Sequence, residues 1–146
     1  MWPNPQPGEP NEVSSTIVIP ISPGELIDKI TILEIKQRRI TDPQKLQHVS
    51  RELALLRSAR DRAIPLSQEL IGLTAKLHEV NESLWQIEDD VRSCERTHDF
   101  GLRFIALARS VYQQNDERAA LKREINTLLH APFQEQKSYA TDSSSP

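Results

Sequence analysis

Between residues 22 and 128, apolar residues recur every three or four positions, which is the spacing of amphipathic helices. The most regular run is the seam of Leu70, Leu73, Leu77, Val80, Leu84, Ile87, Val91 and Cys94. These eight consecutive matches to a 3.5-residue repeat predict a long helix of the coiled-coil type. Pro65 interrupts the pattern before the seam and Ser67 is a suitable N-cap, so we expect this helix to begin beside Ser67.

Three more helices are predicted from start and stop signals. Residues 22–25 read Ser-Pro-Gly-Glu, a capping box with proline at the first helical position, and that helix should end near Arg39. A second helix starts by the same logic around Asp42. The chain reverses near residues 99–101, and a last helix follows to Leu128. Because only a short turn joins them, the long helix and the last helix should pack antiparallel as a hairpin.

The remaining parts of the chain lack a helical pattern. Residues 1–13 are rich in proline and residues 132–146 end in a polar serine run, so both are predicted to be disordered tails of one helical domain at 14–131. Between the first tail and the first helix, residues 16–21 (TIVIPI) form a short β-branched run. The chain offers no second strand for it. This run therefore either lies along the helices in extended form or pairs with a partner chain.

Together these elements predict an all-α fold: a long antiparallel helical hairpin packed with two N-terminal helices and preceded by a short extended or strand segment. Charge supports this arrangement. Residues 22–63 hold nine Lys/Arg against six Asp/Glu, a balance of +3, and residues 100–131 hold five against three, a balance of +2. Residues 67–99 hold three against eight, a balance of −5. An acidic helix between two basic segments predicts ion pairs between neighbouring helices.

Composition narrows the functional classes. A net charge of −3 is not the footprint of a nucleic-acid-binding protein. No apolar run approaches the roughly 20 residues that cross a bilayer, and the first 21 residues do not resemble a secretory signal. The single cysteine, Cys94, excludes an internal disulfide framework. We therefore expect a cytoplasmic protein without a cofactor and without a membrane or nucleic-acid partner.

Four stretches of the chain resemble an uncharacterised family of short bacterial helical proteins, a domain of unknown function. The stretches are SPGELIDKITILEIK at 22–36, NESLWQIEDDVR at 81–92, FIALARSVYQQNDERAALKREIN at 104–126 and EQKSY at 135–139. The resemblance covers residues 16–139. It implies a bacterial cytoplasmic origin and a single domain, and it implies no catalytic residues.

Polar residues interrupt the apolar stripe of the last helix. Arg109, Tyr112 and Asp116 share one face of it, while Asn115 and Arg118 occupy repeat positions where apolar side chains are expected. Polar residues of the long helix should lie across the hairpin from them. Two interpretations are open: a buried polar network that fixes the register of the helices, and a patch that holds a small anionic ligand through arginine. The candidate site residues are Asn81, Trp85, Asp89, Arg109, Tyr112, Asn115, Asp116 and Arg118.

Other chemistry-bearing patterns have simpler explanations. Cys94 and His98 have the i, i+4 spacing of two metal ligands, but a structural zinc ion needs four, and no second pair completes the set. No metal site is predicted. Residues 99–101 spell the Asp-Phe-Gly triplet of kinases without the other kinase motifs, so we interpret Asp99 as a cap and Gly101 as a turn residue.

No catalytic constellation stands out, although the sequence leaves enzymatic activity open. The leading hypothesis is a non-catalytic helical interaction, scaffold or accessory module whose partner is a second copy, as in a homodimer, or another protein. The alternative is a binding module or enzyme subunit that takes a small anionic ligand or a nucleotide sugar at the polar patch between the two long helices.

Overall fold

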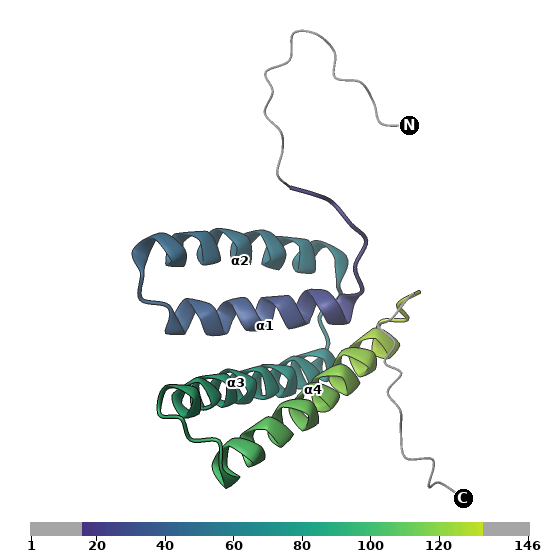
Figure 1. The fold of residues 1–146 in the computed structure, drawn as a ribbon. Helices are drawn as coiled ribbons and strands as arrows, with labels where there is room; N and C mark the ends of the chain where they lie inside the picture. The colour runs from purple at the N-terminus through teal and green to yellow at the C-terminus, as the bar shows by residue number, and fades with distance from the viewer. Residues whose placement is uncertain (1–15, 133–146) are drawn as a thin grey trace, which may run out of the picture.

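The computed structural model describes residues 16–132, and within these residues the chain forms four α-helices and no strand. The helices are α1 (Pro23–Arg39), α2 (Pro43–Ala63), α3 (Gln68–Arg96) and α4 (Leu102–Leu128). The predicted all-α class and the predicted helix limits are thus confirmed (Figure 1). The predicted tails, 1–13 and 132–146, lie outside the described residues except for Pro132.

Three of the four helices begin at the polar residues that the sequence indicates. Ser22, Asp42 and Ser67 are the N-caps of α1, α2 and α3. Their side-chain oxygens accept hydrogen bonds of 3.2, 2.9 and 3.1 Å from backbone N–H groups of the first turn. Such bonds satisfy donors that the helix itself leaves unpaired, which is why these residues fix the helix starts.

The turn between α3 and α4 places a residue other than glycine in the left-handed conformation. The left-handed residue is His98, with a φ of 53°, whereas Gly101 is the N-cap of α4. The Asp99 N–H donates to the Cys94 carbonyl at 2.9 Å and the His98 N–H to the Glu95 carbonyl at 3.2 Å. This is the Schellman pattern that ends helices, and here the chain adopts it without glycine. The Asp99 side chain accepts the Gly101 N–H at 3.2 Å within the turn. Because the N-cap of α4 is Gly101 and no side chain caps this helix, the prediction that Asp99 is a cap is wrong.

The central helix of the fold is α1. It packs against α2 on one side and against α3 and α4 on the other, while α2 packs on α1 alone among these helices (Figure 1). The most extensive helix pair is α3 with α4, the predicted hairpin. One buried cluster joins α1, α3 and α4 and contains Ile27, Leu70, Leu77, Val80, Leu121 and Ile125. A second cluster joins α1 and α2 and contains Leu26, Ile30, Leu33 and Leu53.

The apolar seam of α3 is shared by two neighbours. Five of its eight residues are buried, with Leu77 and Cys94 at 0% exposed, and the other three are partly buried, so most of the seam is hidden from water as its regular spacing predicts. However, Ile27 of α1 lies in the same cluster as Leu77 and the α4 residue Leu121. The seam therefore meets a groove between α1 and α4, and not α4 alone.

The β-branched run before α1 is extended and is not part of a strand. Its residues Ile17, Val18 and Ile19 are 83%, 92% and 65% exposed, so the run does not lie along the helices of its own chain. Only at Ile21 does the chain come down onto the cluster of α1 and α2. Pairing with a partner chain stays a prediction. Within residues 16–132, no helix is both long and apolar enough to cross a membrane.

Candidate functional site

A buried carboxylate on α1 is the centre of the candidate site. Asp28 is 0% exposed. Its Oδ1 accepts hydrogen bonds from Arg118 Nε of α4 at 3.0 Å and from Asn81 Nδ2 of α3 at 2.9 Å, and its Oδ2 accepts one from Arg118 Nη2. Asn81 also donates to Thr31 Oγ1 at 2.8 Å, and that hydroxyl donates to the Asp28 carbonyl at 2.7 Å. Three helices thus contribute to one polar network.

Electrostatics makes the members of this network depend on one another. A carboxylate without water contact is stable only where cations and donors replace its hydration. The Arg118 guanidinium supplies the charge in a two-pronged geometry, and its side chain remains 28% exposed. Among the described residues, no fully buried side-chain N or O atom lacks a hydrogen-bond partner. The first interpretation of the polar break in α4, a buried network, thus has a structural basis.

A second polar layer ties the start of α1 to the end of α4. Lys122, 8% exposed, pairs with Glu25 at 3.0 Å. Asn126, 1% exposed, accepts the Gly24 N–H at 2.7 Å through its Oδ1. Gly24 sits so close to α4 that an added Cβ would lie 2.5 Å from the Lys122 carbonyl oxygen. Only glycine permits this approach.

Beside the Asp28 network lies an open pocket of about 550 Å³ between α3 and α4. It brings together five of the eight predicted site residues: Asn81, Trp85, Asp89, Asn115 and Arg118. The remaining lining residues are Ile32, Leu84, Glu88, Arg92 and Val111. We call this the hairpin pocket. Its lining carries two carboxylates and two guanidinium groups, so it can take up either sign of charge.

The other three predicted residues are not part of the hairpin pocket. Arg109, Tyr112 and Asp116 are exposed on α4 and do not line it. Conversely, Asp28, Thr31 and Arg92 belong to the network or the pocket and were not predicted. The sequence does contain a signal for Asp28 and Thr31, because both are polar residues within the apolar face of the first helix.

The predicted ion pairs between neighbouring helices are present at the surface. Arg39 of α1 pairs with Glu82 of α3, and Arg103 of α4 lies 4.0 Å from Asp90 of α3. The hydrogen bond from Arg39 lowers the pKa of Glu82 below its ordinary value of 4.5, and the nearby positive charges of Arg39 and Arg38 act in the same direction. Burial of the Glu82 carboxylate acts in the opposite direction and raises its pKa, but the lowering effects prevail.

The Cys94 and His98 pair does not form a metal site in this arrangement. Cys94 is 0% exposed inside α3, whereas His98 is exposed beyond the end of that helix. In the part of the chain that the structure describes, no group of three His, Cys, Asp or Glu side chains is arranged to hold a metal ion.

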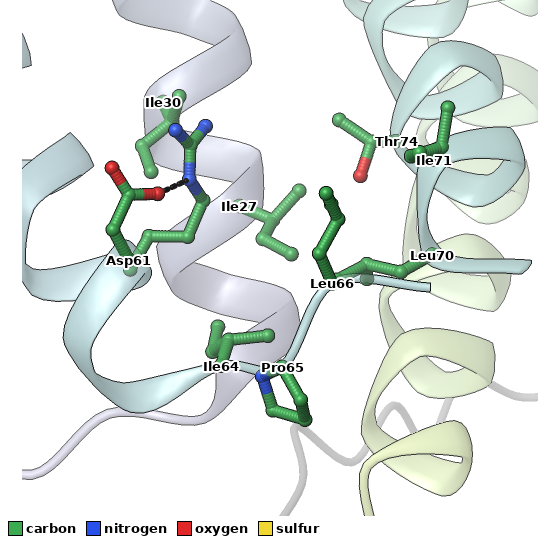
Figure 2. A pocket seen from close by; sticks show the side chains of 10 residues that line it. Ile27, Ile30, Asp61, Ile64, Pro65, Leu66, Leu70, Ile71 and Thr74 are labelled. Atoms are coloured by element: carbon green, nitrogen blue, oxygen red, sulfur yellow. Dashed lines mark hydrogen bonds and ion pairs between the residues drawn. The ribbon is translucent and has the colours of Figure 1, made fainter. Parts of the chain in front are cut away.

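A second pocket, of about 500 Å³, lies where α1, the end of α2 and the start of α3 meet (Figure 2). We call it the junction pocket. Leu66 projects from the linker after α2 into the space between α1 and α3, and Asp61 of α2 lies at the other side (Figure 2). Asp61 forms an ion pair of 2.9 Å with Arg60. The lining residues are mostly apolar: Ile27, Ile30, Arg60, Asp61, Ile64, Pro65, Leu66, Leu70, Ile71 and Thr74.

These features define a small all-α protein in which one central helix lies between a single helix and a helical hairpin. A model of a family of unknown function, DUF6165, matches residues 17–146, and the chain belongs to this family. The predicted membership of an uncharacterised family is thereby confirmed. No curated protein and no solved structure matches the chain.

Proposed function

We propose that the protein is a non-catalytic helical interaction module that binds an apolar segment of a partner protein at the junction pocket. The observation that carries the proposal is the apolar lining of this pocket, which combines a buried floor with an exposed rim. Ile27 and Leu70 of the floor are 2% and 4% exposed, whereas Leu66 and Ile71 of the rim are 79% and 45% exposed.

The floor and the rim have different roles in binding. Ile27 and Leu70 belong to the core cluster of α1, α3 and α4, so the floor is already formed before a partner arrives. Leu66 and Ile71 expose apolar surface to water, and covering them stabilises a complex by about 25 cal/mol for each Å² removed from water. The Arg60–Asp61 pair gives the pocket a polar border, as protein interfaces commonly have.

Site-specific photocrosslinking in the cells that make the protein tests this proposal. A photoreactive phenylalanine at position 71 should give a defined adduct with one protein, and the same residue at position 55 should not. Leu55 is the matched control because it is an equally apolar, 62% exposed residue of α2 that does not line the pocket.

Substitution of the rim provides the second arm of this experiment. Leu66→Asp should remove the adduct and Leu55→Asp should leave it unchanged, because only the first places a charge at the pocket. Both side chains are exposed, so both variants should fold. Adducts that persist in Leu66→Asp, or that form equally from position 55, would contradict the proposal.

A second candidate function is the binding of a small anionic ligand, such as a nucleotide sugar, in the hairpin pocket. The observation that favours it is the convergence of Trp85, Asn115 and two arginines on one hollow of suitable size. Arg118 is already bound to Asp28, so the exposed Arg92 is the cation that we assign to the ligand.

Thermal-shift measurements with a panel of anionic metabolites and nucleotide sugars test this second candidate. We expect Arg92→Ala to abolish any ligand-induced shift and Arg109→Ala to preserve it, because Arg109 lies outside the pocket. A shift that survives Arg92→Ala, or the lack of a shift with every compound, would count against this function.

A further inference from the structure

We propose that a second copy of this chain docks on the outer face of α4, the exposed stripe formed by Leu102, Ile105, Arg109, Tyr112 and Asp116. The two α4 helices would pack antiparallel around a twofold axis beside Tyr112. This face is separate from the junction pocket, so the proposal does not rest on the function proposed above.

The first reason is that α4 is apolar on two sides and packed on one. Its inner side places Leu121 and Ile125 in the core. On its outer face, Leu102, Ile105 and Tyr112 are 86%, 51% and 55% exposed. Their positions at i, i+3 and i+10 fall within an arc of about 80° on one side of the helix. A helix with such a second apolar stripe has surface to bury against another partner.

The second reason is charge. Arg109 precedes Tyr112 in α4 and Asp116 follows it. Each lies roughly 5 Å along the helix from the proposed twofold axis beside Tyr112. In an antiparallel pair, Arg109 of one copy meets Asp116 of the other, and the symmetry forms this ion pair twice. A parallel pair would instead set Arg109 against Arg109. The face therefore complements itself in the antiparallel orientation.

The third reason is shape. A hollow of about 650 Å³ lies beside the C-terminal half of α4 and is lined by Leu73, Ala120, Arg123, Glu124, Thr127 and Leu128. Along the axis of α4, Leu102 lies roughly 16 Å before the twofold axis, and the hollow lies about the same distance after the twofold axis. Antiparallel packing therefore brings the highly exposed Leu102 of one copy to the hollow of the other. There it would contact Leu73 and Leu128.

Sedimentation velocity of the full-length chain between about 1 and 100 µM tests the proposal. The wild type should approach twice the mass of one chain as its concentration rises. Arg109→Asp and Asp116→Arg should each weaken the dimer by about tenfold or more, because each sets like charges against one another twice. The double variant, R109D/D116R, should restore the dimer to within about twofold, because it exchanges the charges without changing their pairing.

Leu102→Asp should also give a monomer, whereas Leu55→Asp, at an exposed leucine of α2, should remain dimeric. Circular dichroism should show unchanged helix content, since all of these side chains are exposed. The proposal is overturned if the wild type stays monomeric at 100 µM. It is also overturned if Leu102→Asp leaves the dimer intact, or if the double charge variant fails to recover it.

Discussion

At the scale of single residues, the fold depends on the hydrogen bonds and the ion pair that stabilise one buried carboxylate in place of water. Asp28 can remain in the core because Arg118 and Asn81 reach it from two other helices. Removing its charge leaves a guanidinium whose partner is gone and an amide whose acceptor is altered. Breaking a buried pair from one side is more damaging than the net stability of the pair suggests, since the remaining charge keeps its desolvation penalty.

We therefore expect Asp28→Asn to lower the free energy of unfolding by about 3 kcal/mol, the lower end for buried pairs because Arg118 is partly exposed. Urea unfolding followed by circular dichroism measures this change. Asp61→Asn is the matched control, because Asp61 pairs with Arg60 at the surface, where such pairs contribute about 0–1 kcal/mol. Equal losses of stability in the two variants would show that burial of Asp28 has no special cost.

The ion pair of Arg39 with Glu82 carries a pH dependence of known sign. The folded state lowers the pKa of Glu82, so its contribution to stability is full above the ordinary pKa of 4.5 and is lost as the pH falls through the lowered value. Glu82→Gln should reduce the free energy of unfolding by about 0.5 kcal/mol at neutral pH, since the pair is exposed. The difference between wild type and variant should shrink as the pH falls through the lowered pKa, and urea midpoints measured at a series of pH values from about 7 down to about 2 follow this loss. A difference that stays constant over this range would rule out this electrostatic origin.

At the scale of helices, the close approach of α1 to α4 depends on one glycine. A Cβ at Gly24 would lie 2.5 Å from the Lys122 carbonyl oxygen and 3.0 Å from Asn126 Oδ1, so Gly24→Ala must push the helices apart. We expect this change to destabilise the protein by about 1–3 kcal/mol, the usual cost of overpacking.

Gly72→Ala is the internal control for that prediction, and its expected sign is opposite. Gly72 lies within α3, and apart from the backbone of its own helix and its chain neighbours, no heavy atom would come within 4 Å of an added Cβ there. Alanine at this position should stabilise the protein by about 0.5–1 kcal/mol through its better helix propensity. The midpoints of thermal unfolding of the two variants, each compared with that of the wild type, measure these stability changes. Shifts of the same sign would contradict the close approach at Gly24.

The helices themselves were predictable because their signals are local. A cap such as Ser22 acts within one turn, and the seam of α3 repeats within a single element, so neither depends on the rest of the chain. The burial of Asp28 depends instead on Arg118, which is 90 residues away in the sequence. A polar residue within an apolar face indicates that a distant partner exists, but the sequence does not say which residue it is.

The geometry of the α-helix also explains why only some of the predicted site residues line the hairpin pocket. Each step of three residues falls about 60° short of a full turn of an α-helix, so successive steps drift around it. Tyr112 and Arg118, two such steps apart, are therefore separated by about 120°. Arg118 points to the core and the hairpin pocket, while Tyr112 faces solvent. The sequence pattern grouped residues that the helix separates.

At the scale of the whole molecule, the helices do not share the core equally. Both the α2 cluster and the hairpin cluster meet at α1, but α2 contributes a single buried residue, Leu53, and packs on α1 alone among the described helices. The hairpin and α1 are joined by an apolar cluster and by the Asp28 network as well. Local opening is easiest where few buried contacts must break.

We therefore expect α2 to detach from the rest of the protein before global unfolding, so that its amides exchange with solvent at least about tenfold faster than those of α1 and of the first half of α3. Hydrogen–deuterium exchange with mass spectrometry measures this difference at neutral pH. Leu53→Ala removes the buried anchor of α2 and should accelerate exchange in α2 more than in the hairpin, because the hairpin keeps its own contacts with α1. Equal rates in α2, α1 and α3, with Leu53→Ala raising all three together, would mean that the four helices open as one cooperative unit despite the uneven core.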